Sequence, residues 1–185
     1  YRVHALNADG STRLTITDTR TGEPLRLTGI PDGDLGGVRF NRDETMIAFT
    51  VASDTSPADI FVADLATGEA RRLTRALNPA IDEDQLVEAE VARFRSYDGL
   101  EIPGILYRPH QAGPDDKVPA LVWVHGGPGG QSRLNYFALV QYLVNHGYAI
   151  LAVNNRGSSG YGKEFNHLDD KNHGQTHTAA GRKNM

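Results

Sequence analysis

Residues 120–130 read ALVWVHGGPGG, and residues 148–162 read YAILAVNNRGSSGYG. Each stretch begins with a continuous apolar run, which is typical of a strand that is buried on both faces of a sheet. The two runs predict strands over Ala120–Val124 and Tyr148–Val153. In each stretch, glycines and polar residues follow the strand directly, and these polar segments are the candidate sites.

Between the two strands, apolar residues recur at helical spacing. They predict a helix from about Arg133 to His146, with Ser132 as its N-cap and Gly147 just after its C-terminal end. A strand, a helix and a second strand in this order form a βαβ unit, so we expect the two strands to be parallel. The second half of the chain is therefore expected to be α/β.

The segment His125–Gly130 lies where α/β folds place ligands, at the carboxyl end of a strand. Its glycines allow backbone N–H groups to approach a ligand closely, and a loop of this kind supplies half of the oxyanion hole in α/β-hydrolases. Two alternatives stay open. A phosphate-binding loop is disfavoured because Gln131 breaks the Gly-x-Gly-x-x-Gly spacing and no Lys-Ser/Thr pair follows. The other alternative is a purely structural tight turn.

The second candidate segment, Asn154–Gly162, follows the next strand. Neither Ser158 nor Ser159 fits the Gly-x-Ser-x-Gly pattern of a nucleophile elbow, so we expect neither to be a nucleophile. Arg156 carries a rigid fork of donors, and we expect it to brace this loop together with Gly157.

A hairpin precedes these motifs. Strand-like runs at Glu90–Tyr97 and Glu101–Tyr107 flank Asp98-Gly99, which predicts a tight turn with positive φ at both residues. Before the hairpin, residues 77–86 are polar and acidic and contain Asn-Pro, which indicates a linker.

The first half contains an internal repeat. Leu14–Asp18 and Ile60–Asp64 are strand-like, and each is followed by Thr-Gly-Glu, at residues 21–23 and 67–69, an offset of 46 residues. This pattern predicts strand, polar glycine turn and strand in both copies.

Two more predicted strands, Gly37–Phe40 and Thr45–Ala52, lie between the copies. Four strands in about 40–50 residues is the pattern of a β-propeller blade. A plain antiparallel meander is the alternative. Because a propeller needs at least four blades, the propeller interpretation makes residues 1–76 the last part of a larger domain.

The composition excludes several classes of protein. The 19 Lys and Arg residues against 23 Asp and Glu residues give a net charge of −4, which argues against a nucleic-acid or anionic-membrane surface. No apolar run approaches the roughly 20 residues of a membrane helix. The chain has no cysteine, which excludes disulfides and a cysteine nucleophile. No signal peptide is visible after Tyr1, which favours a cytoplasmic protein. Because the first residue is not methionine, we also expect the N-terminal part of the protein to be missing.

Three histidines near the C-terminus, His167, His173 and His177, lie close to Asp169 and Asp170. Gly174 weakens any helix that would align them, and few apolar residues follow position 166. We therefore expect a solvated tail with no metal site, and no cofactor elsewhere.

Taken in order, the blade-like repeats, the acidic linker, the Asp-Gly hairpin, His-Gly-Gly-Pro-Gly-Gly and Asn-x-Arg-Gly-Ser-x-Gly-Tyr-Gly resemble the prolyl oligopeptidase family of serine peptidases. The resemblance covers about residues 1–165 and is strongest to the acylaminoacyl-peptidase and dipeptidyl-peptidase-like members. It implies a β-propeller over the active site of an α/β-hydrolase domain, a peptide substrate and a serine acyl-enzyme. By this resemblance, Gly126 and Gly127 lie on the oxyanion loop, and His125 stands where other members carry an assisting tyrosine. It also implies that the loop around Arg156 lies beside the substrate cleft.

The family pattern places the Ser, Asp and His of the triad after the fifth strand of the hydrolase domain. The strand that ends at Val153 would be the fourth, so we expect no catalytic triad residue in this chain. We therefore expect an internal fragment: the last propeller blades at 1–76, the linker at 77–86, and the first half of the hydrolase domain at 87–185, with an unpatterned tail from 166. The fragment alone is expected to be inactive. A non-catalytic β-rich interaction module and a carboxylesterase-like hydrolase are the alternatives.

Overall fold

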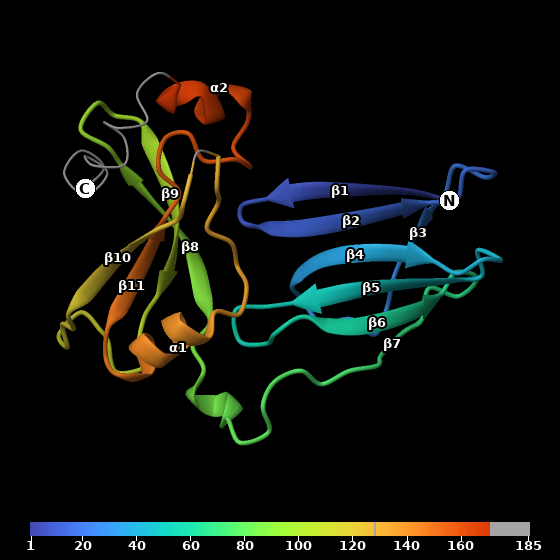
Figure 1. The fold of residues 1–185 in the computed structure, drawn as a ribbon, viewed down its shortest axis with the longest axis horizontal. Coiled ribbons are helices and arrows are strands. Elements are labelled where there is room, and N and C mark those ends of the chain that lie inside the picture. Colours follow the sequence, from blue (N-terminus) through green and yellow to red (C-terminus); the bar gives the residue numbers. More distant parts are fainter. Residues whose placement is uncertain (128, 171–185) are drawn as a thin grey trace. The chain divides into compact units, whose positions relative to one another are not determined.

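The computed structural model describes residues 1–127 and 129–170. The described chain is mostly β-sheet with few helices (Figure 1). It divides into two compact units, of which the first comprises residues 1–83 and 134–137 and the second comprises residues 84–133 and the chain from 138 onward. None of the described helices is long and apolar enough to cross a membrane.

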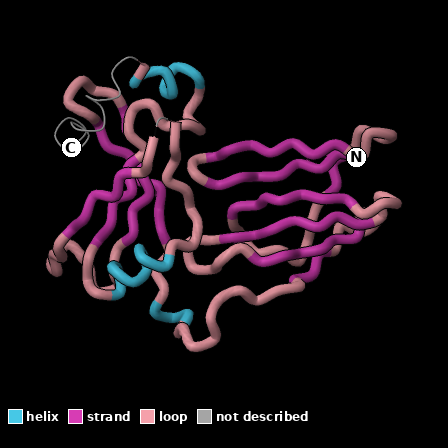
Figure 2. Tube along the Cα trace, in the orientation of Figure 1, coloured by secondary structure: helices cyan, strands magenta, loops and turns pink. Residues whose placement is uncertain are grey.

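The first unit contains two antiparallel sheets in which neighbouring strands follow chain order. Figure 2 shows the strands and the loops that join them. The three-stranded sheet consists of β1 (Arg2–Ala8), β2 (Ser11–Thr17) and β3 (Pro24–Leu25). The four-stranded sheet consists of β4 (Asp34–Phe40), β5 (Met46–Ala52), β6 (Asp59–Asp64) and β7 (Ala70–Arg72).

Both sheets contribute to one buried apolar cluster. In β5, Ile47, Phe49 and Val51 are buried and alternate with less buried residues, as expected for a strand with one face in a core. The ring of Phe49 stacks on that of Phe61 in β6, with centroids 6.0 Å apart. This alternation fixes the register of β5, because a shift of one residue would expose all three side chains.

The predicted repeat of strand, glycine turn and strand is confirmed. Gly22 and Gly68 have φ values of 80° and 76°, and each donates its N–H to an aspartate carbonyl oxygen, of Asp18 and Asp64, at 2.8 Å. The two turns, 46 residues apart in sequence, have equivalent hydrogen bonds. Both need a residue at positive φ in the same position, which explains the glycine in each.

Two strands in this unit begin three residues earlier than predicted. The strand expected from Leu14 begins at Ser11, and the strand expected at Gly37–Phe40 begins at Asp34. The pairing of β4 with β5 shifts register between Gly36 and Arg39, and Gly37 has a φ of 61°. A β-bulge thus continues β4 across Gly36, which the prediction left in a loop.

The second unit is built on a four-stranded sheet with the order β10-β11-β9-β8. Its strands are β8 (Ala89–Arg95), β9 (Glu101–Tyr107), β10 (Ala120–Val124) and β11 (Ala149–Val153). The pair β10–β11 is parallel, as the βαβ prediction requires, and the other two pairs are antiparallel. The helices are η1 (Glu83–Gln85), within the expected linker, α1 (Ala138–Asn145), α2 (Lys163–Asn166) and η2 (His167–Asp169).

The expectation that Ala120–Val124 is buried on both faces is wrong. This strand, β10, lies at one edge of the sheet, and Leu121, Val122 and Val124 are each about 40 % exposed. An apolar sequence indicates a strand that needs covering, but it does not tell a central strand from an edge strand. The prediction holds better for β11, which is paired on both sides and has Ile150 and Val153 buried.

The predicted start of the helix is also wrong. The helix α1 begins at Ala138 rather than near Arg133, so Ser132 is not its N-cap. The backbone N–H and C=O of Ser132 instead pair with the side-chain amide of Asn154, at 2.6 and 3.0 Å. This pairing keeps Ser132 out of a helix. The predicted end is close, because Gly147 follows with a φ of 89°.

The Asp98-Gly99 hairpin is present, but its turn differs from the prediction. The loop between β8 and β9 is longer than two residues, and only Gly99 has positive φ, at 85°. Ser96 and Leu100 close it with an N–H···O=C bond of 2.8 Å. The Asp98 carboxylate accepts the Leu100 N–H at 3.2 Å, which is an Asx turn within this loop.

Candidate functional site

The two candidate segments follow paired ends of two parallel strands. Val124, the last residue of β10, lies opposite Val153, the last residue of β11. We call residues 125–130 the glycine loop and residues 154–162 the arginine loop. Because the strands are parallel, both loops leave the sheet at the same edge, which is where α/β folds hold their ligands.

Two hydrogen bonds join the loops directly. The His125 Nε2 atom lies 2.9 Å from the Ser158 Oγ atom, and the backbone N–H of Ser159 donates to the Gly130 carbonyl oxygen at 3.0 Å. The structure therefore brings together the residues that the sequence placed in two separate motifs.

The glycine loop contains two backbone donors without a protein acceptor among the described residues. Gly126 and Gly127 are exposed residues, and in the described part of the chain their N–H groups donate to no protein atom. Gly129 has a φ of 75°. A Cβ at Gly130 would lie 2.2 Å from the Gly126 carbonyl oxygen, so this close backbone approach requires glycine. Two N–H groups of exposed glycines are thus free to bind an anionic or carbonyl oxygen.

Arg156 is bound on one side by the β8–β9 turn. Its guanidinium donates to the Asp98 carboxylate and lies 5.6 Å from the centre of the Tyr97 ring. The hydrogen bond from Arg156 is the largest cause that holds the pKa of Asp98 below its usual value. These contacts orient the arginine loop from a hairpin 58 residues earlier in the chain, which sequence patterns do not reveal.

Gly157 packs against the segment that follows the loop. It has a φ of 89°, and a Cβ there would lie 2.1 Å from the Asp169 carboxylate carbon. Its N–H donates to the Phe165 carbonyl oxygen, and its own carbonyl oxygen accepts from the Asn166 side chain, both at 3.0 Å. Within the tail expected from residue 166, Asn166 and the buried Asp169 therefore pack on this glycine. Residues 171–185 lie outside the described residues.

The two serines of the arginine loop lack the exposed hydroxyl that a catalytic nucleophile presents to its substrate. Ser158 is fully buried, and its Oγ lies 2.6 Å from the Asn155 carbonyl oxygen. Ser159 is half-buried.

Sequence reasoning missed the two asparagines of the arginine loop. Asn154 is fully buried and also donates to the Tyr161 hydroxyl at 2.8 Å. Among the described residues, the Asn155 Oδ1 is the one buried side-chain polar atom without a hydrogen-bond partner. An NN dipeptide after a buried strand is the only sequence signal for either.

The histidines near the C-terminus are only partly described. His167 pairs with Asp170, with 2.5 Å between Nδ1 and Oδ2. In the part of the chain that the structure describes, no group of His, Asp and Glu residues is arranged to hold a metal ion. His173 and His177 lie outside that part.

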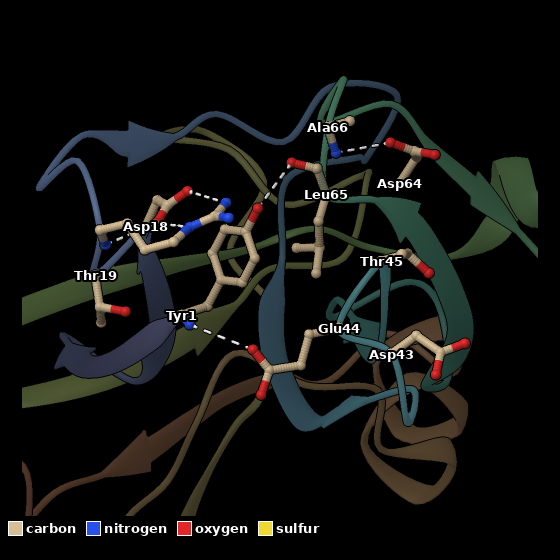
Figure 3. A pocket seen from close by; sticks show the side chains of 10 residues that line it. Tyr1, Asp18, Thr19, Asp43, Glu44, Thr45, Asp64, Leu65 and Ala66 are labelled. Atoms are coloured by element: carbon tan, nitrogen blue, oxygen red, sulfur yellow. Dashed lines mark hydrogen bonds and ion pairs between the residues drawn. The ribbon is translucent and has the colours of Figure 1, made fainter.

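A cavity of about 540 Å³ opens in the first unit, and none of its lining residues belongs to the two loops. It lies at the turns of the repeat (Figure 3). The Tyr1 hydroxyl donates to the Leu65 carbonyl oxygen at 3.5 Å. On its wall, Asp18 accepts from the Arg20 side chain and backbone, which lowers the Asp18 pKa to about 2.

Comparison with known sequences identifies a family. The sequence model of the prolyl oligopeptidase family matches residues 135–179. An uncharacterized peptidase, YuxL of Bacillus subtilis, is 32 % identical over 123 residues, which are 66 % of this chain and 19 % of that protein. Dipeptidyl aminopeptidase BIII of Pseudoxanthomonas mexicana is 32 % identical over 147 residues, which are 76 % of this chain and 21 % of that protein. The chain thus spans about a fifth of the length of these curated relatives.

Comparison with solved structures agrees. The crystal structure of puromycin hydrolase covers 96 % of this chain with a TM-score of 0.74 and 26 % sequence identity, and the match spans 29 % of that chain. The family match also continues to residue 179, so the expected end of the resemblance near residue 165 is wrong. By sequence and by fold, the chain belongs to the prolyl oligopeptidase family.

Proposed function

We propose that the chain is part of a serine peptidase that hydrolyses short peptides through an acyl-enzyme. In this proposal, residues 1–76 form the last blades of a β-propeller, residues 77–86 are the linker, and residues 87–185 form the first half of an α/β-hydrolase domain. Family membership, the repeated strand-turn-strand units and the parallel β10–β11 pair support it.

The observation that carries the proposal is that Gly126 and Gly127 are exposed residues whose N–H groups have no protein acceptor among the described residues. When a serine attacks a peptide carbonyl, negative charge develops on the carbonyl oxygen. Donors that already point at this oxygen stabilise the charge without reorganising. We assign this role to the two N–H groups, with His125 beside them, and the support of the arginine loop to Arg156 and Gly157.

The nucleophile lies outside this chain in the proposal. Ser158 is fully buried and hydrogen bonded, and no serine of the chain stands in a Gly-x-Ser-x-Gly elbow. The elbow also supplies the second half of the oxyanion hole, from the residue after the nucleophile. The 185-residue chain by itself should therefore form no acyl-enzyme.

Hydrolysis of aminoacyl 4-nitroanilides and of 4-nitrophenyl esters by the full-length gene product tests the proposal. A peptidase hydrolyses the anilides at a rate that saturates with substrate. Turnover of the esters alone would favour the carboxylesterase alternative, and no turnover of either substrate would favour the interaction module.

A further inference from the structure

We propose that Ser158 positions the N–H group of Gly127, and that it acts through the ring of His125. The inference rests on the proposed function, because it concerns how the oxyanion donor is aimed. Ser158 itself touches no reacting atom in this account, so it is a positioning residue.

The His125 ring is held at both nitrogens. Nδ1 lies 2.9 Å from the Gly126 carbonyl oxygen. Because a carbonyl oxygen can only accept, Nδ1 carries the hydrogen of this bond. Nε2 lies 2.9 Å from the Ser158 Oγ, whose single hydrogen serves either this contact or the contact with the Asn155 carbonyl oxygen at any one time. The contacts at both nitrogens together restrict the rotation of the ring.

Ser158 gives the ring a rigid support. Its side chain is fully buried, its Oγ lies 2.6 Å from the Asn155 carbonyl oxygen, and its N–H donates to that same oxygen at 3.0 Å. A hydroxyl fixed in this way determines where Nε2 lies, and the opposite edge of the ring then determines where the Gly126 carbonyl points.

The contact between His125 and the Gly126 carbonyl oxygen sets the direction of the Gly126–Gly127 peptide group. In a trans peptide, the C=O of one residue and the N–H of the next lie in one plane and point in opposite directions. Once His125 holds the carbonyl of Gly126, the N–H of Gly127 points the other way. Gly127 is an exposed residue, and among the described residues its N–H has no protein acceptor.

The same peptide group is confined from a second side. A Cβ at Gly130 would lie 2.2 Å from the Gly126 oxygen and 2.6 Å from the His125 Nδ1. The Gly130 backbone thus closes against them, and the Ser159 N–H holds the Gly130 carbonyl oxygen at 3.0 Å. Two consecutive residues of the arginine loop therefore hold the glycine loop, one by its side chain and one by its backbone.

The test compares the full-length peptidase with its Ser158→Ala variant, by crystal structure and by kinetics on an aminoacyl 4-nitroanilide. Loss of one oxyanion donor lowers kcat by about 100- to 1,000-fold. A misaimed donor should lose part of this, so we expect kcat to fall roughly 10- to 100-fold while KM changes less than about threefold. In the variant crystal, the Gly126–Gly127 peptide should have turned away from its wild-type direction.

Two further variants make the test specific. Ser11→Ala removes a serine hydroxyl that likewise bonds a backbone carbonyl oxygen, that of Ala8 at 3.0 Å, and it should leave kcat within about twofold, since that position lies in β2, outside both loops and the turn that supports them. In a His125→Ala background, Ser158→Ala should have no further effect, because the two residues act in series. Ser158→Cys keeps most of the side-chain volume, and it replaces Ser158→Ala if the latter does not fold.

An unchanged peptide direction in the Ser158→Ala or Ser158→Cys crystal would overturn the inference. Additive losses of kcat in the Ser158 and His125 double variant would overturn it as well. If the wild-type protein hydrolyses no anilide, the proposed function fails, and the crystal structures alone decide whether Ser158 aims the peptide.

Discussion

The side-chain amide of Asn154 satisfies both backbone polar groups of Ser132. Its Oδ1 accepts the Ser132 N–H at 2.6 Å, and its Nδ2 donates to the Ser132 carbonyl oxygen at 3.0 Å. This contact joins Asn154, the first residue after β11, to the chain just beyond the glycine loop. The side chain of Asn154 is fully buried. It therefore fixes the separation of the two loops on which the candidate site is built.

Asn154→Ala should destabilise the full-length protein clearly. The substitution leaves the backbone groups of the half-buried Ser132 without these partners, and each lost hydrogen bond costs about 0.5–1.5 kcal/mol. Thermal unfolding measures the effect, and we expect a lower Tm together with reduced anilide turnover. The matched control is Asn145→Ala, an exposed site at the end of α1, which should change Tm little. Equal effects of the two substitutions would contradict the role assigned to Asn154.

Gly157→Ala and Gly99→Ala separate steric conflict from backbone strain. The two glycines have φ values of 89° and 85°, but a Cβ at Gly157 would lie 2.1 Å from the Asp169 carboxylate carbon, whereas a Cβ at Gly99 meets nothing within 4 Å. Both variants carry strain from positive φ, of roughly 1–3 kcal/mol. Only Gly157→Ala must also displace Asp169, so its Tm should be the lower by several degrees. Equal Tm values would show that Asp169 moves away from the new Cβ without loss of stability, which would contradict this prediction.

The ion pair of Asp98 and Arg156 predicts a pH dependence. The folded protein holds the pKa of Asp98 below its ordinary value, mainly through the hydrogen bond from Arg156. A lowered pKa stabilises the folded state above the unfolded value, about 3.9, and this contribution is lost as pH falls through the folded value. Asp98→Asn should therefore lower Tm at pH 7, and the difference from wild type should shrink toward about pH 3. Asp115→Asn, at an exposed turn, is the control, and a pH-independent difference at Asp98 would contradict the ion pair.

Asp18 provides a test in the first unit. Its pKa is lowered to about 2, first by the hydrogen bond from the Arg20 side chain and then by that from the Arg20 backbone. Arg20→Ala removes the first and keeps the second, as at the equivalent position of the second repeat, which is Ala66. NMR titration of the Asp18 carboxyl group should show its pKa raised toward 3.8 but still below it. An unchanged pKa would mean that the Arg20 side chain does not pair with Asp18 in solution.

Local patterns in the sequence predicted the elements that depend on local chemistry. The two Thr-Gly-Glu turns need glycine at positive φ, and both have it at Gly22 and Gly68. The strands β9 and β10 have their predicted bounds. The parallel β10–β11 pair follows from the order of strand, helix and strand.

The errors come from contacts between residues that are distant in sequence. Ser132 was expected to cap a helix, but Asn154, 22 residues later, captures its backbone. The exposure of β10 depends on what neighbours it, which composition does not encode. The partners of Arg156 and His125, Asp98 and Ser158, lie 58 and 33 residues away, and no spacing rule connects them.

The most direct test of the central claim, that this chain supplies oxyanion donors but not the nucleophile, is to locate the serine that reacts with a fluorophosphonate. The full-length gene product is labelled, digested, and the modified peptide is identified by mass spectrometry. We predict one modified serine outside residues 1–185, and no labelling of the 185-residue chain alone. Stoichiometric labelling of that chain at Ser158 or Ser159, abolished by substitution of the labelled serine with alanine, would contradict the account.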